Sequence, residues 1–131
     1  MITPYFLNLI AGNAMHSNSV APIPANYYVA LSTTTPAEDG TGLTEVTGGA
    51  YARSAFGSGS APGDGLVTNL NDVEFQEATA NWGTVKAFGI YDSVVGGNLL
   101  AFDVLQDEQV IVTGNQVRFK PGALKLKFRA V

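Results

Sequence analysis

The sequence predicts an all-β fold, a single-domain antiparallel β-sandwich or small barrel that carries a short N-terminal helix or arm. Short apolar or alternating runs recur between turn residues at intervals of about 8–12 positions, which gives roughly eight strands. Turn formers are frequent, with 15 Gly and 6 Pro among 131 residues. This length suits one ordinary domain with a real core. We therefore expect an N-terminal arm over residues 1–26 and a β-domain over residues 27–131.

The N-terminal segment, residues 1–18, has the features of a short helix. Thr3 can cap it, and Pro4 suits the first helical position. The polar run His16–Ser19 is expected to end it. The segment contains no charged residue, and its apolar run is too short for a membrane span or a secretion signal. Its apolar side chains therefore need a cover, either the chain's own domain or a neighbouring subunit, and the candidates for inter-subunit contact are Ile2, Phe6, Leu9 and Ile10.

The remaining elements follow from alternation and turn signals along the chain. The Gly/Ser-rich stretch 57–65 is expected to be a flexible loop, because it resembles a linker in composition. The last predicted strand alternates apolar Leu124, Leu126 and Phe128 with basic residues, the pattern of a half-buried strand. Strands are expected at residues 27–33, 51–56, within 67–75, and at 84–91, 99–105, 109–112, 116–119 and 124–129.

The stretch 81–105 is the centre of the predicted fold. A strand over 84–91 is followed by turn residues and a returning strand, which predicts a hairpin. Gly89 lies within the first strand, where a missing side chain usually marks a bulge or a close backbone approach. Trp82, the only Trp, is the predicted core anchor. We expect it to pack at the end of the sandwich beneath residues 50–56, with its indole N–H bonded to a loop carbonyl.

Charge is sparse and unevenly distributed. Charged residues make up 14% of the chain, and the formal net charge is −4. All acidic residues lie at or before Glu108, whereas most of the basic residues fall in the last segment. One strand face is too narrow a basic footprint for nucleic acid. The basic strip is therefore either a solvated face or a surface that docks on an acidic neighbour, and its residues are Arg118, Lys120, Lys125, Lys127 and Arg129.

The motifs of common catalytic and cofactor sites are missing. The chain has no Cys and a single His, His16, which leaves no zinc-thiolate or cysteine–histidine pair. Gly57-x-Gly59 lacks the third glycine and the strand–helix context of a dinucleotide fingerprint. Three acidic clusters, near Glu38, Asp72 and Asp103, do not follow calcium-loop spacing. We predict no metal, no cofactor and no enzymatic activity, although a hydrolase with two facing carboxylates stays an alternative.

Aromatic residues suggest one further alternative, a carbohydrate-binding module for host recognition. Aromatic side chains on strands more often belong to the core, with the tyrosine hydroxyl at its rim. The residues that could instead form a sugar-stacking platform are Trp82, Tyr27, Tyr28, Tyr51 and Tyr91.

An ordered set of motifs resembles a known family. The set covers about residues 27–126 and consists of Tyr28–Pro36, Asp39–Gly42, Glu45–Arg53, Phe75, Ala78–Val85, Phe88–Asp92 and Gly96–Leu100. In this order the motifs resemble small virion proteins of tailed bacteriophages, often labelled tail fibre proteins. The resemblance implies a non-enzymatic structural component of the particle, without nucleic-acid or membrane partners.

The place on the particle is predicted from the compactness of the chain. It lacks a long repetitive shaft and has short arms suited to clamping neighbours, which favours a capsid decoration (cement) protein. A tail-associated fibre or adaptor protein is the alternative. The expected partners are the phage major capsid or tail proteins and further copies of the chain, with a trimer as the expected homo-oligomer. The particle would be assembled in the cytoplasm of the bacterial host.

Overall fold

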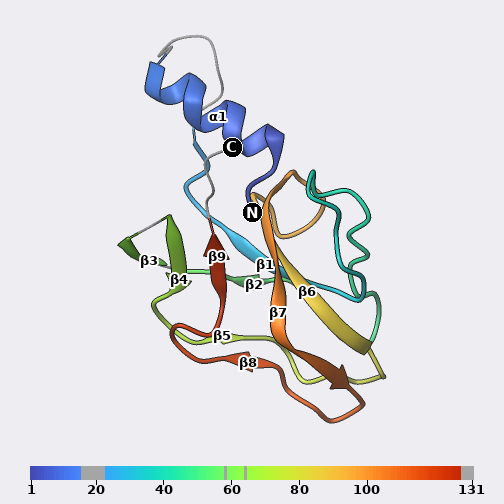
Figure 1. Ribbon diagram of the computed structural model, residues 1–131. Helices are drawn as coiled ribbons and strands as arrows, with labels where there is room; N and C mark the ends of the chain where they lie inside the picture. The colour runs from blue at the N-terminus through green and yellow to red at the C-terminus, as the bar shows by residue number, and fades with distance from the viewer. Residues whose placement is uncertain (16–22, 58, 64, 128–131) are drawn as a thin grey trace.

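A computed structural model describes residues 1–15, 23–57, 59–63 and 65–127 (Figure 1). Every strand pairing is antiparallel. The all-β prediction with a short N-terminal helix is confirmed, and the sheets of the described residues do not close into a barrel. The elements are α1 (Pro4–Met15), β1 (Tyr28–Ser32), β2 (Ser54–Ala55), β3 (Gly59–Gly63), β4 (Leu66–Asn69), β5 (Val73–Glu74), β6 (Gly83–Tyr91), β7 (Leu99–Ile111), β8 (Arg118–Phe119) and β9 (Lys125–Lys127).

The largest sheet has the strand order β2-β1-β6-β7 and contains the predicted central hairpin. Two smaller sheets, β3-β4-β9 and β5-β8, supply the other side of the core. In β1 and β6, Val29 lies opposite Ile90 and Leu31 opposite Phe88, so these four side chains share one face. All four are buried in the main apolar cluster. Alternate residues of β1 and β6 therefore direct one face of this sheet into the core.

The second face of the large sheet is covered at Gly89. A Cβ atom there would lie 2.8 Å from Leu99 Cδ1 and 3.0 Å from Leu43 Cδ1. The close approach at this glycine is therefore made by side chains and not by another backbone, and the register of the β6–β7 pair shifts one position later, between Ile90 and Tyr91. Leu43 belongs to the loop between β1 and β2, so this polar loop still contributes an apolar contact to the sheet.

Strand β7 is longer than the sequence predicts. Residues 99–105 and 109–112 were expected as separate strands, whereas β7 runs continuously from Leu99 to Ile111. Val85 of β6 pairs with Gln109 of β7, whereas Ala87 pairs with Val104, so the register shifts between these two pairs. More residues of β7 than of β6 span this interval, which is the geometry of a bulge. The polar residues 106–108 thus belong to a bulge within one strand and do not separate two strands.

The N-terminal segment adds a short strand to the outer edge of β7. Thr3 N donates to Leu100 O at 2.9 Å, and Phe102 N donates to Met1 O at 2.9 Å. The Thr3 hydroxyl also accepts from Phe6 N at 3.3 Å, so Thr3 caps α1 as predicted. The helix starts at Pro4 and extends to Met15. Its expected end at His16–Ser19 lies outside the described residues.

Two predictions near the middle of the chain are wrong. The stretch 57–65, expected as a flexible loop, contains β3, which pairs with β4. Its glycines serve packing, because a Cβ atom at Gly59 would lie 3.1 Å from Val67 Cγ1. The strand expected over 51–56 is reduced to β2, Ser54–Ala55. Ala50, just before it, has a φ of 64°, which interrupts extended backbone.

Asn69 joins β4 to the turn that precedes β9. Its buried amide donates to the carbonyls of Asn71 at 2.8 Å and Lys120 at 3.0 Å, and its Oδ1 accepts from Leu124 N at 3.0 Å. This role could not be predicted from the sequence, because a buried Asn that bridges two segments has the same local pattern as an Asn in a turn.

Asn69→Ala is expected to lower the free energy of unfolding by about 1–3 kcal/mol, because it leaves the buried Leu124 N–H without its acceptor. Urea unfolding monitored by circular dichroism measures the loss. Asn71→Ala is the matched control, since the Asn71 side chain is exposed and only its backbone carbonyl contacts Asn69. Equal unfolding midpoints for the two variants would contradict the bridging role.

Candidate docking surfaces

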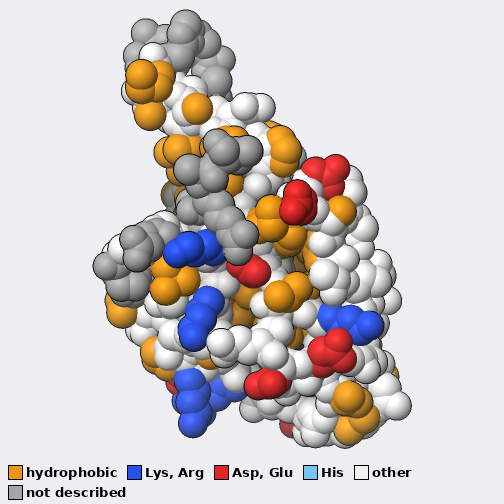
Figure 2. All heavy atoms as spheres, in the orientation of Figure 1, with side chains coloured by type: hydrophobic (Ala, Val, Ile, Leu, Met, Phe, Trp, Pro, Cys, Tyr) orange, Lys and Arg blue, Asp and Glu red, His pale blue; other side chains and the backbone are white. Residues whose placement is uncertain are grey.

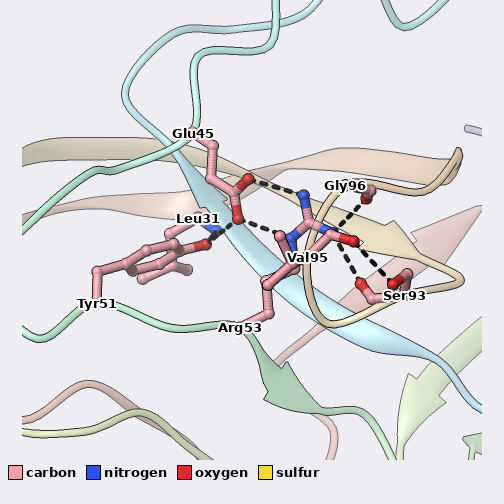
Figure 3. A network of polar contacts seen from close by, with 7 residues as sticks. All are labelled: Leu31, Glu45, Tyr51, Arg53, Ser93, Val95 and Gly96. Atoms are coloured by element: carbon pink, nitrogen blue, oxygen red, sulfur yellow. Dashed lines mark hydrogen bonds and ion pairs between the residues drawn. The ribbon is translucent and has the colours of Figure 1, made fainter.

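A polar network centred on Arg53 joins separate loop segments of the chain (Figure 3). Arg53 Nε and one terminal nitrogen each donate to a carboxylate oxygen of Glu45, both at 2.8 Å. The other terminal nitrogen donates to the carbonyls of Ser93 and Gly96, both at 2.7 Å. The guanidinium carbon also lies 3.7 Å from the centroid of the Tyr91 ring. Arg53 therefore joins the segment before β2 to the loop between β6 and β7.

Tyr51 connects this network to the large sheet. Its hydroxyl donates to Glu45 Oε2 at 2.6 Å and accepts from Leu31 N of β1 at 3.0 Å. Burial, with a further contribution from the neighbouring carboxylate, raises the pKa of Tyr51. Burial alone would also raise the pKa of Glu45, but the hydrogen bonds from Arg53 and Tyr51 outweigh it and hold that pKa below its ordinary value. The Glu45–Arg53 pair is therefore ionised at neutral pH.

The network holds an exposed apolar loop in place. Val94 and Val95 lie between the two carbonyls that Arg53 binds, and Val95 is 80% exposed. A shallow hollow of about 320 Å³ lies beside them, lined mainly by Glu45–Gly48 and the 51–53 segment. The two valines are therefore exposed apolar side chains on a loop that Arg53 holds in place.

Helix α1 presents a second apolar surface. Phe6 and Leu9 are buried against the chain's own Leu100, with Tyr27 at the edge of the cluster, and Ile2 and Ile10 are half-buried beside them. The exposed apolar side chains of the helix are Tyr5, Leu7 and Met15, of which Met15 is 87% exposed. Figures 1 and 2 show the helix extending beyond the sheets with apolar side chains on its surface. Of the predicted contact residues, Phe6 and Leu9 are thus covered by the chain itself, whereas Ile2 and Ile10 stay partly accessible.

The described part of the basic strip is on the surface. Lys125 and Lys127 flank the buried Leu126 of β9, and Lys125 and Lys120 are exposed. Arg118 forms ion pairs with Asp72 and with Glu74, the latter at 3.2 Å. Its charge is therefore partly neutralised within the chain. Arg129 lies outside the described residues.

Trp82 is a core residue, as predicted. Its side chain belongs to the main cluster and only 5% of the residue is exposed. The indole N–H donates to the Gly49 carbonyl at 2.9 Å, which confirms the expected bond to a loop carbonyl. Tyr51 meets the indole edge-on, with ring centroids 5.4 Å apart. A buried indole cannot stack on a sugar, so the platform centred on Trp82 is not formed.

The other chemical candidates are dispersed. His16 lies outside the described residues, as does Asp64 of the 57–65 stretch. Gly57 and Gly59 flank the start of the β3–β4 hairpin. Within the described residues no group of three or more His, Cys, Asp or Glu is placed to hold a metal ion. Nor does a described helix combine the length and apolar character needed to cross a membrane.

The Glu45–Arg53 pair is the feature of this region that the sequence did not reveal. Both residues lie in one of the motifs that carried the family resemblance, but nothing there identified them as partners. A usable signal was present, since two opposite charges flank Gly48-Gly49, a turn that brings the two sides of the segment together. Gly49 has a φ of 59°, and a Cβ atom on it would lie 2.7 Å from Trp82 Nε1. The turn that brings Glu45 and Arg53 together therefore also leaves room for the Trp82 side chain.

Comparison with known proteins identifies the family. Residues 3–127 match the family described as podophage GP4 fiber I protein gp80. No curated protein matches the sequence. The match extends from the cap of α1 to the last residue of β9, so it includes the helix, the Arg53 network and all three sheets. Members of a phage fibre family are structural proteins of the virion and in general are not enzymes. The chain belongs to this family of podophage fibre proteins.

Proposed function

We propose that the chain is a fibre-associated structural component of the podophage tail, which attaches to another virion protein through the exposed face of α1. The helix carries the proposal because its twelve residues contain no charge. A surface helix normally places charged or polar residues on its solvent side. The exposed side chains Tyr5, Leu7 and Met15 instead offer an apolar face, as an interface with another protein requires.

The buried side of the same helix makes it a rigid attachment element. Phe6 and Leu9 fix it to β7 through Leu100, and the Thr3 hydroxyl bonds to the Leu99 carbonyl at 2.7 Å. Docking therefore would not require the helix to order on binding, which removes one entropic cost of association. The anchored Val94–Val95 loop is a second rigid apolar contact of the same kind. In the proposed division into an arm over 1–26 and a β-domain over 27–131, α1 belongs to the arm and the Val94–Val95 loop to the β-domain.

The family match favours the tail over the head, since the family is described as a fibre protein. Capsid decoration stays a prediction, and the expected trimer and the assembly in the host cytoplasm stay predictions with it. The sugar-binding alternative has less support, because its central aromatic residue is buried.

The double variant Leu7→Glu/Met15→Glu is expected to fold normally and to lose at least about tenfold in incorporation into particles, because two charges would be buried at the interface. Incorporation is measured by immunoblot of purified virions after the variant is supplied in trans to phage that lack the gene. Leu70→Glu is the matched control, since Leu70 is an exposed leucine outside the helix.

Immunogold electron microscopy of the same virions locates the chain. Label on the tail supports the proposal, and label over the head supports capsid decoration. Absence of the native chain from virions would overturn both. Normal incorporation of the double variant would show that the exposed face of α1 is not the attachment surface.

A further inference from the structure

Two columns of opposite charge lie side by side on one face of the molecule. Figure 2 shows basic side chains gathered over β9 and β8, with acidic side chains beside them over β7. The basic column consists of Lys120, Lys125 and Lys127, and the acidic column of Asp103, Asp107 and Glu108. Strands β9 and β7 are neighbours, because Lys127 N donates to Asp103 Oδ2 at 3.4 Å.

Most of these charges are not used within the chain. Among the described residues, the three lysines of the basic column form no ion pair, and neither do Asp107 and Glu108. Asp103 is the exception, since it lies 3.4 Å from the Met1 ammonium. Burial of the intervening Leu126 and Leu124 fixes where the lysines emerge. The bulge of β7 displays Asp107 and Glu108 at the surface.

The outer edge of β7 is open along the acidic column. Met1–Thr3 covers this edge at residues 100–102, and in the described chain no strand pairs with it over residues 104–110. The exposed side chains here include Val104 and Val110, the latter 67% exposed. An uncovered edge with exposed valines invites association unless something covers it. A groove of about 500 Å³ begins at residues 109–111 and is bounded on its far side by the basic segment 115–120.

We propose that this face binds a second copy of the chain across a two-fold axis that runs between the two columns. When two such faces meet about that axis, the lysines of each copy lie opposite the acids of the other. The contact is therefore self-complementary, which is the requirement for an isologous dimer, and this two-fold dimer takes the place of the trimer expected from the sequence. Val110 of both copies, which lines the groove beside the basic segment, is buried in the same contact.

Charge also excludes the simplest competing arrangement. Direct pairing of β7 with β7 of a second copy, edge to edge, would bring Asp107 and Glu108 of both chains together, and like charges placed opposite each other destabilise strand pairs. The face-to-face arrangement separates them and supplies each with a lysine. Arg118 takes little part, because Asp72 and Glu74 already neutralise it.

Charge reversal on the two columns separately tests the proposal. Variant one is Lys125→Glu/Lys127→Glu, and variant two is Asp107→Lys/Glu108→Lys. A dimer of either variant alone has like charges opposite each other at both of its symmetry-related contacts. Its dissociation constant is therefore expected to rise by more than about tenfold. An equal mixture of the two restores attraction at both contacts and is expected to form dimers again. Sedimentation velocity at low salt measures all four samples, and circular dichroism verifies that each variant is folded.

The controls make every outcome decisive. Glu38→Lys changes the charge of an exposed residue outside both columns and is expected to leave the dimer unchanged. Added salt is expected to dissociate the native dimer, because exposed charges are screened. A native chain that is monomeric at low salt and high protein concentration would overturn the proposal. So would variants that associate like the native chain, or a mixture that forms trimers or larger species instead of dimers.

Discussion

Trp82→Ala is expected to lower the free energy of unfolding by about 3–5 kcal/mol, the usual cost of removing a buried aromatic side chain. The indole is 5% exposed and fills the core between Tyr51 and the loop at Gly49. A loss of this size is a large part of the stability of a small domain. The melting temperature should fall steeply, and incorporation into particles should fall with it. Thermal melting followed by circular dichroism measures the change.

Trp82→Phe separates the two roles of the indole. Phenylalanine keeps much of the apolar packing but has no N–H for the Gly49 carbonyl, so its cost should be smaller, with a hydrogen-bond part of about 1 kcal/mol. Val95→Ala, at an exposed loop position, should not change the melting temperature. A Trp82→Ala protein that melts like the native chain but no longer binds a ligand would show that the residue serves a surface.

Glu45→Gln is expected to destabilise the fold by about 3 kcal/mol, at the lower end of the 3–5 kcal/mol that loss of one partner of a buried ion pair costs. The Arg53 side chain is only 7% exposed, so its charge would stay buried without a counter-ion, whereas the Glu45 side chain is 24% exposed. Guanidinium unfolding measures the loss. The matched control is Glu45→Gln/Arg53→Met, which removes both charges and should recover part of the stability. Equal losses for the single and double variants would contradict a coupled pair.

The same pair predicts how stability depends on pH. The pKa of Glu45 in the folded chain lies below its ordinary value of 4.5. The unfolded chain therefore binds the proton first, and the stabilisation is complete above that ordinary value and is lost as the pH falls through the folded pKa. Unfolding midpoints of the native chain should fall below about pH 4.5. Glu45→Gln should show a weaker fall, and identical profiles would rule out Glu45 as the titrating group.

The sequence was sufficient where one physical signal dominated. Apolar runs bounded by turn residues located β6 and the start of β7, the Thr-Pro pair located the start of α1, and an aromatic side chain before a glycine indicated a buried Trp82. These are local signals, and the structure preserves them because core burial and local preference agree.

The errors arose where composition hid a tertiary contact. The glycines at 57–65 suggested a linker, yet Gly59 lies where Val67 leaves no room for a side chain. The polar residues 106–108 interrupted the predicted strand but form the bulge of a continuous β7. The Asn69 bridge depends on partners up to 55 positions away, such as Leu124. No local pattern contains that information.

The pairing of distant strands has a consequence for synthesis of the protein. Leu66 of β4 pairs with Lys127 of β9, Val73 pairs with Phe119, and Thr3 bonds to the Leu100 carbonyl. A ribosome that has translated only residues 1–90 has released β4 and β5 before their partners β9 and β8 exist. Folding that depends on such distant contacts is slow, on the order of milliseconds to seconds. One edge of β4 therefore stays unpaired until the last residues of β9 emerge, and an unpaired edge exposes the nascent chain to association during this interval.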